Sequence, residues 1–178
     1  MRSPRDTGSE RLSDAHTREK EDPMTSVEDR ILIEDTLYRY ASCIDSANPD
    51  GLVDVLHPDL WAQYGNAEPA EGADVVIGWI REATKSCVWQ HHLLSVYHVD
   101  VQGDSATALV YHTSYQKFEG DDDVCVLVGR YHDELVRHEG TWKISRLVFE
   151  IMWGERRADT AGYLESVGGR GPQVPNWP

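Results

Sequence analysis

The sequence predicts an α+β fold in which helices cover one face of a long, curved, mainly antiparallel sheet. Two observations support this prediction. Apolar residues recur at helical spacing up to about residue 85, whereas from Val88 onward they follow a period of two. Turn segments at 102–104, 119–122 and 138–140 divide the second half into consecutive hairpins. Because helices come first and strands later, they are expected to form separate layers.

About three helices are expected before the long strands. Ser26, followed by an acid three residues on, begins the first helix, which ends at Asp45 with an apolar register through Ile31 and Tyr38. A shorter helix follows Pro49, because proline suits the first turn of a helix. A short strand at 60–64 and a third helix at 73–85 complete this half.

Four long strands are expected in the second half. Both faces of these strands are partly apolar, and helices can cover only one face, so we expect a homodimer through the other. The predicted strands are residues 88–101, 105–118, 124–137 and 141–153.

The predicted domain spans residues 25–153. Residues 1–24 are rich in charge and poor in apolar side chains, which predicts a disordered extension because such a segment buries too little surface to order itself. Residues 154–178 hold several glycines and prolines, which predicts a loop or extended tail.

The charge balance narrows the function classes. The 178 residues include 31 acidic and 17 basic side chains, a formal charge of −14. This balance disfavours nucleic acid and anionic membranes as partners. No apolar stretch approaches the roughly 20 residues of a membrane-spanning helix, and we expect a cytoplasmic protein. Phosphate-binding glycine loops, a nucleophile elbow and paired metal-ligand spacings are missing from the sequence, so no cofactor and no metal are expected.

A carboxylate and a histidine are the best candidates for chemistry. Asp45 ends the first helix in its apolar register, and His91 and His92 are adjacent on a strand, so they point to opposite faces. A histidine paired with a carboxylate in a pocket is a competent base near neutral pH. The structural alternatives are a capping carboxylate and a satisfied core histidine. His112 on the next strand is a second candidate.

Aromatic residues are expected to line the pocket, where phenol groups can donate hydrogen bonds from apolar walls. Charged residues within the strands, such as Arg130, Arg146 and Glu150, are expected to pair with one another instead. Tyr40 is five residues before Asp45 on the helix, so both reach one pocket only if the cavity wraps the helix end. The expected binding residues besides His112 are Tyr64, Trp61, Tyr111 and Trp89.

Several segments, in order along the chain, resemble the SnoaL-like branch of the nuclear transport factor 2-like superfamily over residues 26–153. The resemblance implies a cone-shaped sheet that encloses a pocket. Characterised relatives in this branch include cofactor-free eliminases, so the resemblance also implies an activity of this kind. In those relatives, an Asp at the end of the first helix pairs with a proton-abstracting His. The segments are 89–95 (WQHHLLS), 99–106 (VDVQGDSA), 129–135 (GRYHDEL) and 140–144 (GTWKI).

By motif position, the resemblance places this pair on Asp45 and His92, a Tyr that assists the leaving group on Tyr40, and a second strand histidine on His112. An arginine present in some relatives falls on Leu147 here.

The expected function is therefore a cofactor-independent lyase of the dehydratase type, acting on a small apolar hydroxylated ring compound. An isomerase or polyketide cyclase with the same pair is one alternative. A non-catalytic module for ligand binding or dimerisation is another.

Overall fold

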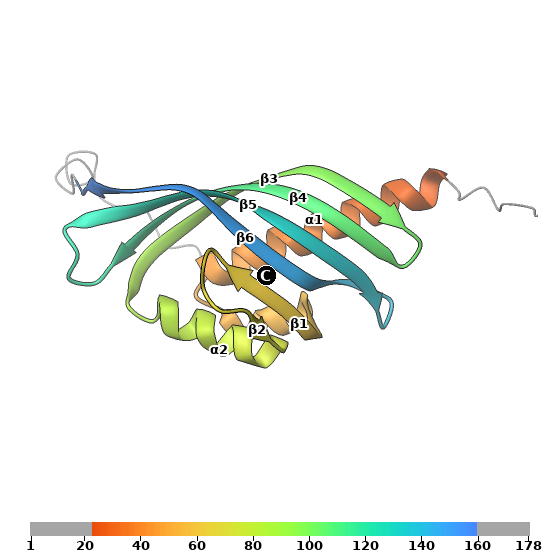
Figure 1. Ribbon diagram of the computed structural model, residues 1–178, viewed down its shortest axis with the longest axis horizontal. Helices are drawn as coiled ribbons and strands as arrows, with labels where there is room; N and C mark the ends of the chain where they lie inside the picture. Colours follow the sequence, from red (N-terminus) through yellow and green to blue (C-terminus); the bar gives the residue numbers. More distant parts are fainter. Residues whose placement is uncertain (1–22, 160–178) are drawn as a thin grey trace, which may run out of the picture.

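The computed structural model describes residues 23–159 and confirms the α+β fold (Figure 1). The predicted helices and long strands are all present, with ends within a few residues of the expected ones except where stated below. In chain order the elements are α1 (Pro23–Asp45), the 3₁₀ helix η1 (Pro49–Asp54), β1 (Leu56–Tyr64), β2 (Ala70–Glu71), α2 (Ala73–Thr84), β3 (Cys87–Gln102), β4 (Ser105–Phe118), β5 (Asp123–His138) and β6 (Thr141–Ala158).

The six strands form one sheet in the order β2-β1-β6-β5-β4-β3. The four long strands are consecutive antiparallel neighbours, as predicted. Two features were not predicted: the short strand β2, and the parallel pairing of β1 with β6. Parallel pairing needs a long crossover connection. Here the chain between β1 and β6 supplies it, because it contains β2, α2 and the three long strands β3, β4 and β5. Strand β3 is consequently left at one edge of the sheet.

The last strand extends beyond its predicted end at residue 153. β6 continues to Ala158, and its final residues pair with the start of β5 from Asp123. Arg156 lies on this extension and pairs with Asp121 and Asp123, so the charged end is held by ion pairs instead of apolar packing. The predicted extension 1–24, apart from its last two residues, and the tail beyond residue 159 lie outside the described residues.

The buried face of α1 also differs from the predicted register. Ile31 and Tyr38 are 61% and 45% exposed, so they face solvent. The helix starts at Pro23, before the predicted cap at Ser26. Its buried side chains still follow the helical period, but they form a stripe beside the predicted one on the helix surface. The helix packs lengthwise on the sheet, and this stripe is the one that the sheet covers. The buried side chains are Ile33, Leu37, Tyr40, Ala41 and Ile44.

The helices lie on one face of the sheet, and the core lies between the two layers. Figure 1 shows the long strands curving over α1, with α2 beside β1. Irregularities in strand register, such as those at Val96–His98 and Val128–Gly129, accompany this curvature. On the opposite face, Leu93 and Tyr97 are exposed, which agrees with the prediction that both faces of the long strands are partly apolar. No described helix is long and apolar enough to cross a membrane.

A buried ion pair fixes the first turns of α1 to the far end of the sheet. The Asp29 carboxylate accepts hydrogen bonds from Arg137 on β5, at 2.5 Å, and from the Trp142 indole on β6, at 3.1 Å. The Arg137 guanidinium also stacks on the Trp142 ring. Burial opposes ionisation of Asp29, but these hydrogen bonds and the charge of Arg137 lower its pKa.

Asp29→Asn is expected to destabilise the fold by about 2 kcal/mol, because a buried hydrogen bond to a charged group is lost. Asp104→Asn is the matched control, since Asp104 contacts the same guanidinium from an exposed position. Because the pKa of Asp29 is lowered, its contribution is complete above the ordinary Asp pKa of 3.8 and is lost as the pH falls below it. Urea unfolding at pH 7 and at low pH measures the loss of stability and its dependence on pH. Equal losses in Asp29→Asn and Asp104→Asn would contradict this role of the Asp29 carboxylate.

Candidate functional site

A cavity of about 320 Å³ lies between α1, α2 and the covered face of the sheet. Its described lining is mostly aromatic and aliphatic and includes no Asp, Glu, Lys or Arg side chain. The polar groups are two histidines, three tyrosines, a serine, a threonine and a glutamine. The lining residues are Tyr40, Ile44, Tyr64, Trp79, Ile80, Ala83, Thr84, His92, His112, Ser114, Gln116, Phe118, Leu127, Tyr131, Phe149 and Ile151.

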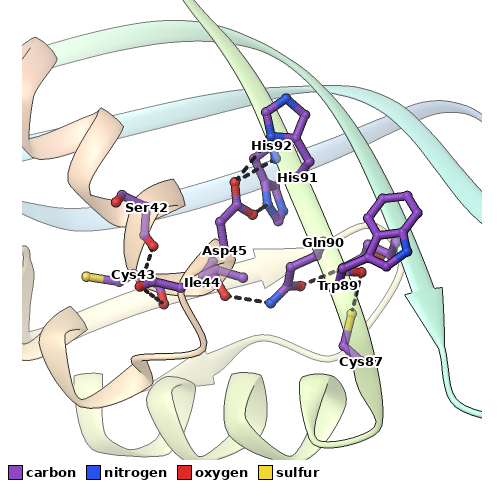
Figure 2. A network of polar contacts seen from close by, with 11 residues as sticks. Ser42, Cys43, Ile44, Asp45, Cys87, Trp89, Gln90, His91 and His92 are labelled. Atoms are coloured by element: carbon purple, nitrogen blue, oxygen red, sulfur yellow. Dashed lines mark hydrogen bonds and ion pairs between the residues drawn. The ribbon is translucent and has the colours of Figure 1, made fainter. Parts of the chain in front are cut away.

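The carboxylate of Asp45 binds His92 through both oxygens (Figure 2). Oδ1 lies 2.5 Å from the ring Nδ1 of His92, and Oδ2 accepts the backbone N–H of the same residue at 2.8 Å. Asp45 ends α1 and His92 lies on the edge strand β3, so the contact joins the helix end to the sheet. Asp45 does not line the cavity itself; it lies behind the histidine ring.

This geometry assigns the proton on the His92 ring. An ionised carboxylate can only accept hydrogen bonds, so Nδ1 carries the hydrogen and donates it to Asp45. In the neutral ring, Nε2 is then left with a free lone pair. The His92 side chain is 7% exposed and lines the cavity, which makes this nitrogen a potential proton acceptor for a bound molecule.

Strand alternation separates His91 from its neighbour. The His91 side chain is 57% exposed, and its Nδ1 lies 4.0 Å from Asp45 Oδ2. His91 does not line the cavity, so of the two adjacent histidines only His92 faces it.

His112 lies beside His92 in the cavity wall, with the ring centroids 5.2 Å apart. It is buried, and neither ring nitrogen has a hydrogen-bond partner among the described residues. Burial, together with the neighbouring His92, lowers the pKa of His112 to about 4, so its ring is neutral near pH 7. A Cβ added at Gly129, on the next strand, would lie 2.6 Å from the Phe149 ring that packs against His112. The bare Gly129 backbone therefore makes room for this wall.

Tyr40 and Tyr64 meet on the wall formed by α1 and β1. Their hydroxyl oxygens are 2.7 Å apart, and Tyr131 packs edge-on against Tyr40. Burial raises the pKa of all three tyrosines, so they are protonated near neutral pH. In a pair of hydroxyls only one proton bridges the two oxygens, which leaves the other available for a bound molecule.

Comparison with known proteins identifies the family. A family model described as SnoaL-like domain matches residues 25–148. The chain belongs to the SnoaL-like family. An uncharacterized protein of Mycobacterium tuberculosis (strain ATCC 25618 / H37Rv) is 29% identical over 127 residues, which cover 70% of this chain and 86% of the relative.

Solved structures share the fold of this SnoaL-like domain. A Novosphingobium aromaticivorans protein named as a candidate scytalone dehydratase aligns with a TM-score of 0.70 at 20% identity, covering 78% of this chain and 97% of its own. A hexachlorocyclohexane dehydrochlorinase from Novosphingobium barchaimii aligns with a TM-score of 0.69 at 13% identity, covering 76% and 94%. At these identities the likeness establishes the fold, one that small-molecule lyases also use.

Three predicted binding residues of the SnoaL-like domain lie away from the cavity. Tyr111 follows Val110 and precedes His112, so alternation turns it to the opposite face, where it packs on Tyr97. Trp61 lies under the guanidinium of Arg146. Trp89 adjoins an irregularity at the start of β3 and is also outside the lining.

Of the strand charges expected to pair with one another, Arg130 and Glu150 do so, whereas Arg146 pairs with a different acid on β5. Arg130 pairs with Glu150 at 2.8 Å, and Arg146 pairs with Glu134 at 3.3 Å. Leu147 is buried in the core.

Asp133 is a buried acid that the sequence analysis did not single out. It lies on β5 on the same face as Tyr131, is 3% exposed, and its Oδ1 has no hydrogen-bond partner among the described residues. Its register neighbours are Ala108 and Leu147, which offer no side-chain donor. Burial raises the pKa of Asp133 well above its usual range, so it is held as a neutral acid. The sequence did offer one signal for Asp133: it follows Tyr131 by two residues on a strand, so the two side chains face the same side.

Asp133→Leu is expected to stabilise the protein at neutral pH by about 1–3 kcal/mol, because an unsatisfied buried polar group is removed. The folded-state pKa is raised, so the wild type is penalised least below the unfolded value of 3.8 and loses stability as the pH rises above it. The difference between variant and wild type should therefore grow from pH 4 to pH 8 in urea unfolding. A difference that stays constant with pH would show that the carboxyl has a partner in the folded state.

Proposed function

We propose that this protein is a cofactor-independent lyase that eliminates water from a small, uncharged, hydroxylated ring compound. The observation that carries the proposal is the Asp45–His92 pair, with the histidine ring facing an apolar cavity and the carboxylate behind it. This is the arrangement that a general base requires, because the acid fixes the tautomer and stabilises the imidazolium that forms.

His92 performs the first step. Its Nε2 takes a proton from a carbon next to an activating group such as a carbonyl, and the electron pair of that C–H bond forms the new carbon–carbon double bond. The positive charge that develops on the ring is stabilised by the Asp45 carboxylate at 2.5 Å. The apolar surroundings strengthen this interaction because they screen it weakly.

The tyrosine pair performs the second step. As the C–O bond breaks, the leaving hydroxyl takes the free proton of the Tyr40–Tyr64 pair and departs as water. The proton held by His92 then restores the tyrosine through solvent, so the net change is loss of one water. His112 is neutral, and neither of its ring nitrogens is hydrogen-bonded to a described residue, so it supplies a hydrogen bond to a polar group of the substrate.

The substrate class follows from the lining. A charged ligand would find no opposite formal charge among the described lining residues, whereas aromatic and aliphatic walls fit an apolar ring. The wall positions of His112 and the tyrosine pair favour a compound with polar groups at more than one position.

An isomerase or cyclase remains the alternative reading of the same pair, because proton abstraction is common to all three reactions. The products separate them: elimination releases water and adds a double bond, whereas isomerisation keeps the mass unchanged. Mass spectrometry of reaction mixtures therefore separates elimination from an isomerisation that conserves the mass.

His92→Ala is expected to reduce kcat by about 10²–10⁴-fold on any ring alcohol that the wild type dehydrates, because general-base catalysis is lost. A panel of ring alcohols bearing a ketone is screened by absorbance of the conjugated product. His98→Ala is the matched control, an exposed histidine on the same strand. Equal turnover by the wild type and His92→Ala, or no turnover on the panel together with ligand binding, would replace the lyase by a binding function.

Asp45→Asn is expected to lower kcat by about 10²-fold or more with a smaller change in KM. An amide that turns its NH₂ toward Nδ1 favours the wrong tautomer of His92, and it no longer stabilises the imidazolium. Steady-state kinetics against pH on the substrate found by the panel measures the effect. A wild-type pH profile in Asp45→Asn would restrict the carboxylate to a structural role.

A further inference from the structure

The last two residues of α1 make three hydrogen bonds with β3, and only two of them belong to the Asp45–His92 pair (Figure 2). The third joins the backbone carbonyl of Ile44 to the side-chain amide of Gln90, whose Nε2 donates at 2.5 Å. Gln90 and His92 are two residues apart on one strand, so their side chains project from the same face, toward the end of the helix.

The Ile44 carbonyl is one of the last four of α1, which lack partners within the helix. It accepts the backbone N–H of Ala47 at 3.0 Å, and Gln90 supplies a second donor from the sheet. This bond fixes how far the helix end lies from β3, one residue before the carboxylate. Asp45 must reach the ring and the backbone of His92 at the same time, so a small displacement of the helix end would break this double contact.

A neighbouring amide fixes the orientation of Gln90. Gln116 on β4, in the cavity wall, donates through Nε2 to Gln90 Oε1 at 3.3 Å. With its oxygen occupied in this way, Gln90 presents its NH₂ group to the helix. A glutamine suits this position because its side chain donates and accepts at once.

We propose that Gln90 is a positioning residue that holds Asp45 in contact with His92. It acts through the Ile44 carbonyl and does not touch the reacting atoms. The catalytic consequence rests on the proposed function, but the positioning itself does not, so the two can fail separately.

The backbone amide of His92 offers a direct measurement of this positioning. β3 is an edge strand, and the His92 N–H donates to the Asp45 carboxylate. The protection of this amide from hydrogen exchange therefore reports whether the carboxylate is in place. No substrate is needed for the measurement.

The experiment compares amide exchange by NMR in the wild type, Gln90→Leu and Gln102→Leu. Gln102 is the matched control, because it lies on the same strand but its side-chain amide donates to the exposed Asp100 instead of to a helix. Gln90→Leu is expected to speed exchange at His92 by about tenfold or more, the equivalent of one lost hydrogen bond to a charged acceptor. Amides in the β4–β5 ladder should keep their rates, and Gln102→Leu should alter neither.

A second variant guards against a general loss of stability. Gln116→Leu leaves Gln90 in place but removes the partner that orients its amide, and it should speed exchange at His92 by a few-fold. With a substrate in hand, Gln90→Leu should lower kcat more than it raises KM. Unchanged exchange at His92 in Gln90→Leu, or an equal increase at every slowly exchanging amide, would overturn the proposal.

Discussion

The docking of α1 on the sheet is the constraint on which the rest of the structure depends. The helix is tied near its start by Asp29 to Arg137 and Trp142, and at its end by Asp45 to His92. Both ties join a carboxylate on the helix to donors on the sheet. Between them, the apolar face of the helix closes the core and supplies one wall of the cavity. An elongated helix held at two distant points has little freedom to slide, and that rigidity is what a site built at its end requires.

Strand alternation then decides which side chains reach the cavity. His92, His112 and Tyr131 lie on the covered face of three successive strands, while their neighbours His91 and Tyr111 lie on the other. The sequence predicted that His91 and His92 must diverge, because the period of a strand is two. The same rule excludes Tyr111 once His112 faces inward, so a consistent use of alternation would have removed it from the predicted binding residues.

The elements themselves were largely predictable because their signals are local. The switch of apolar period near Val88 and the glycine-containing turns depend only on neighbouring residues. The parallel pairing of β1 with β6 joins segments some 85 positions apart, and no local pattern encodes it. The buried register of α1 was misjudged for a related reason. Ile31 and Tyr38 are as apolar as the residues that replace them, and the position of the sheet decides which stripe is covered.

The candidate site shows the same division between local and long-range information. Asp45 and His92 were found from the helix end, the strand and the family resemblance, but the link from Gln90 to Ile44 depends on how two distant elements meet. Asp133 was missed because strand alternation was not applied to it: it follows Tyr131 by two residues on β5 and therefore shares its buried face.

Three aspartates illustrate why composition alone says little about chemistry. Asp29 is buried beside an arginine, and its pKa is lowered. Asp133 is buried with no hydrogen-bond partner for its Oδ1 among the described residues, and its pKa is raised. Asp45 is bound to a histidine at the border of the cavity. One side-chain type thus serves as a structural ion, a neutral acid and the partner of a potential base, and the donors within reach decide which. The net charge of −14 therefore does not describe the cavity, because no acidic side chain occurs among its described lining residues. A ligand would meet aromatic walls and neutral hydrogen-bonding groups, and the carboxylate would act on it only through the ring of His92.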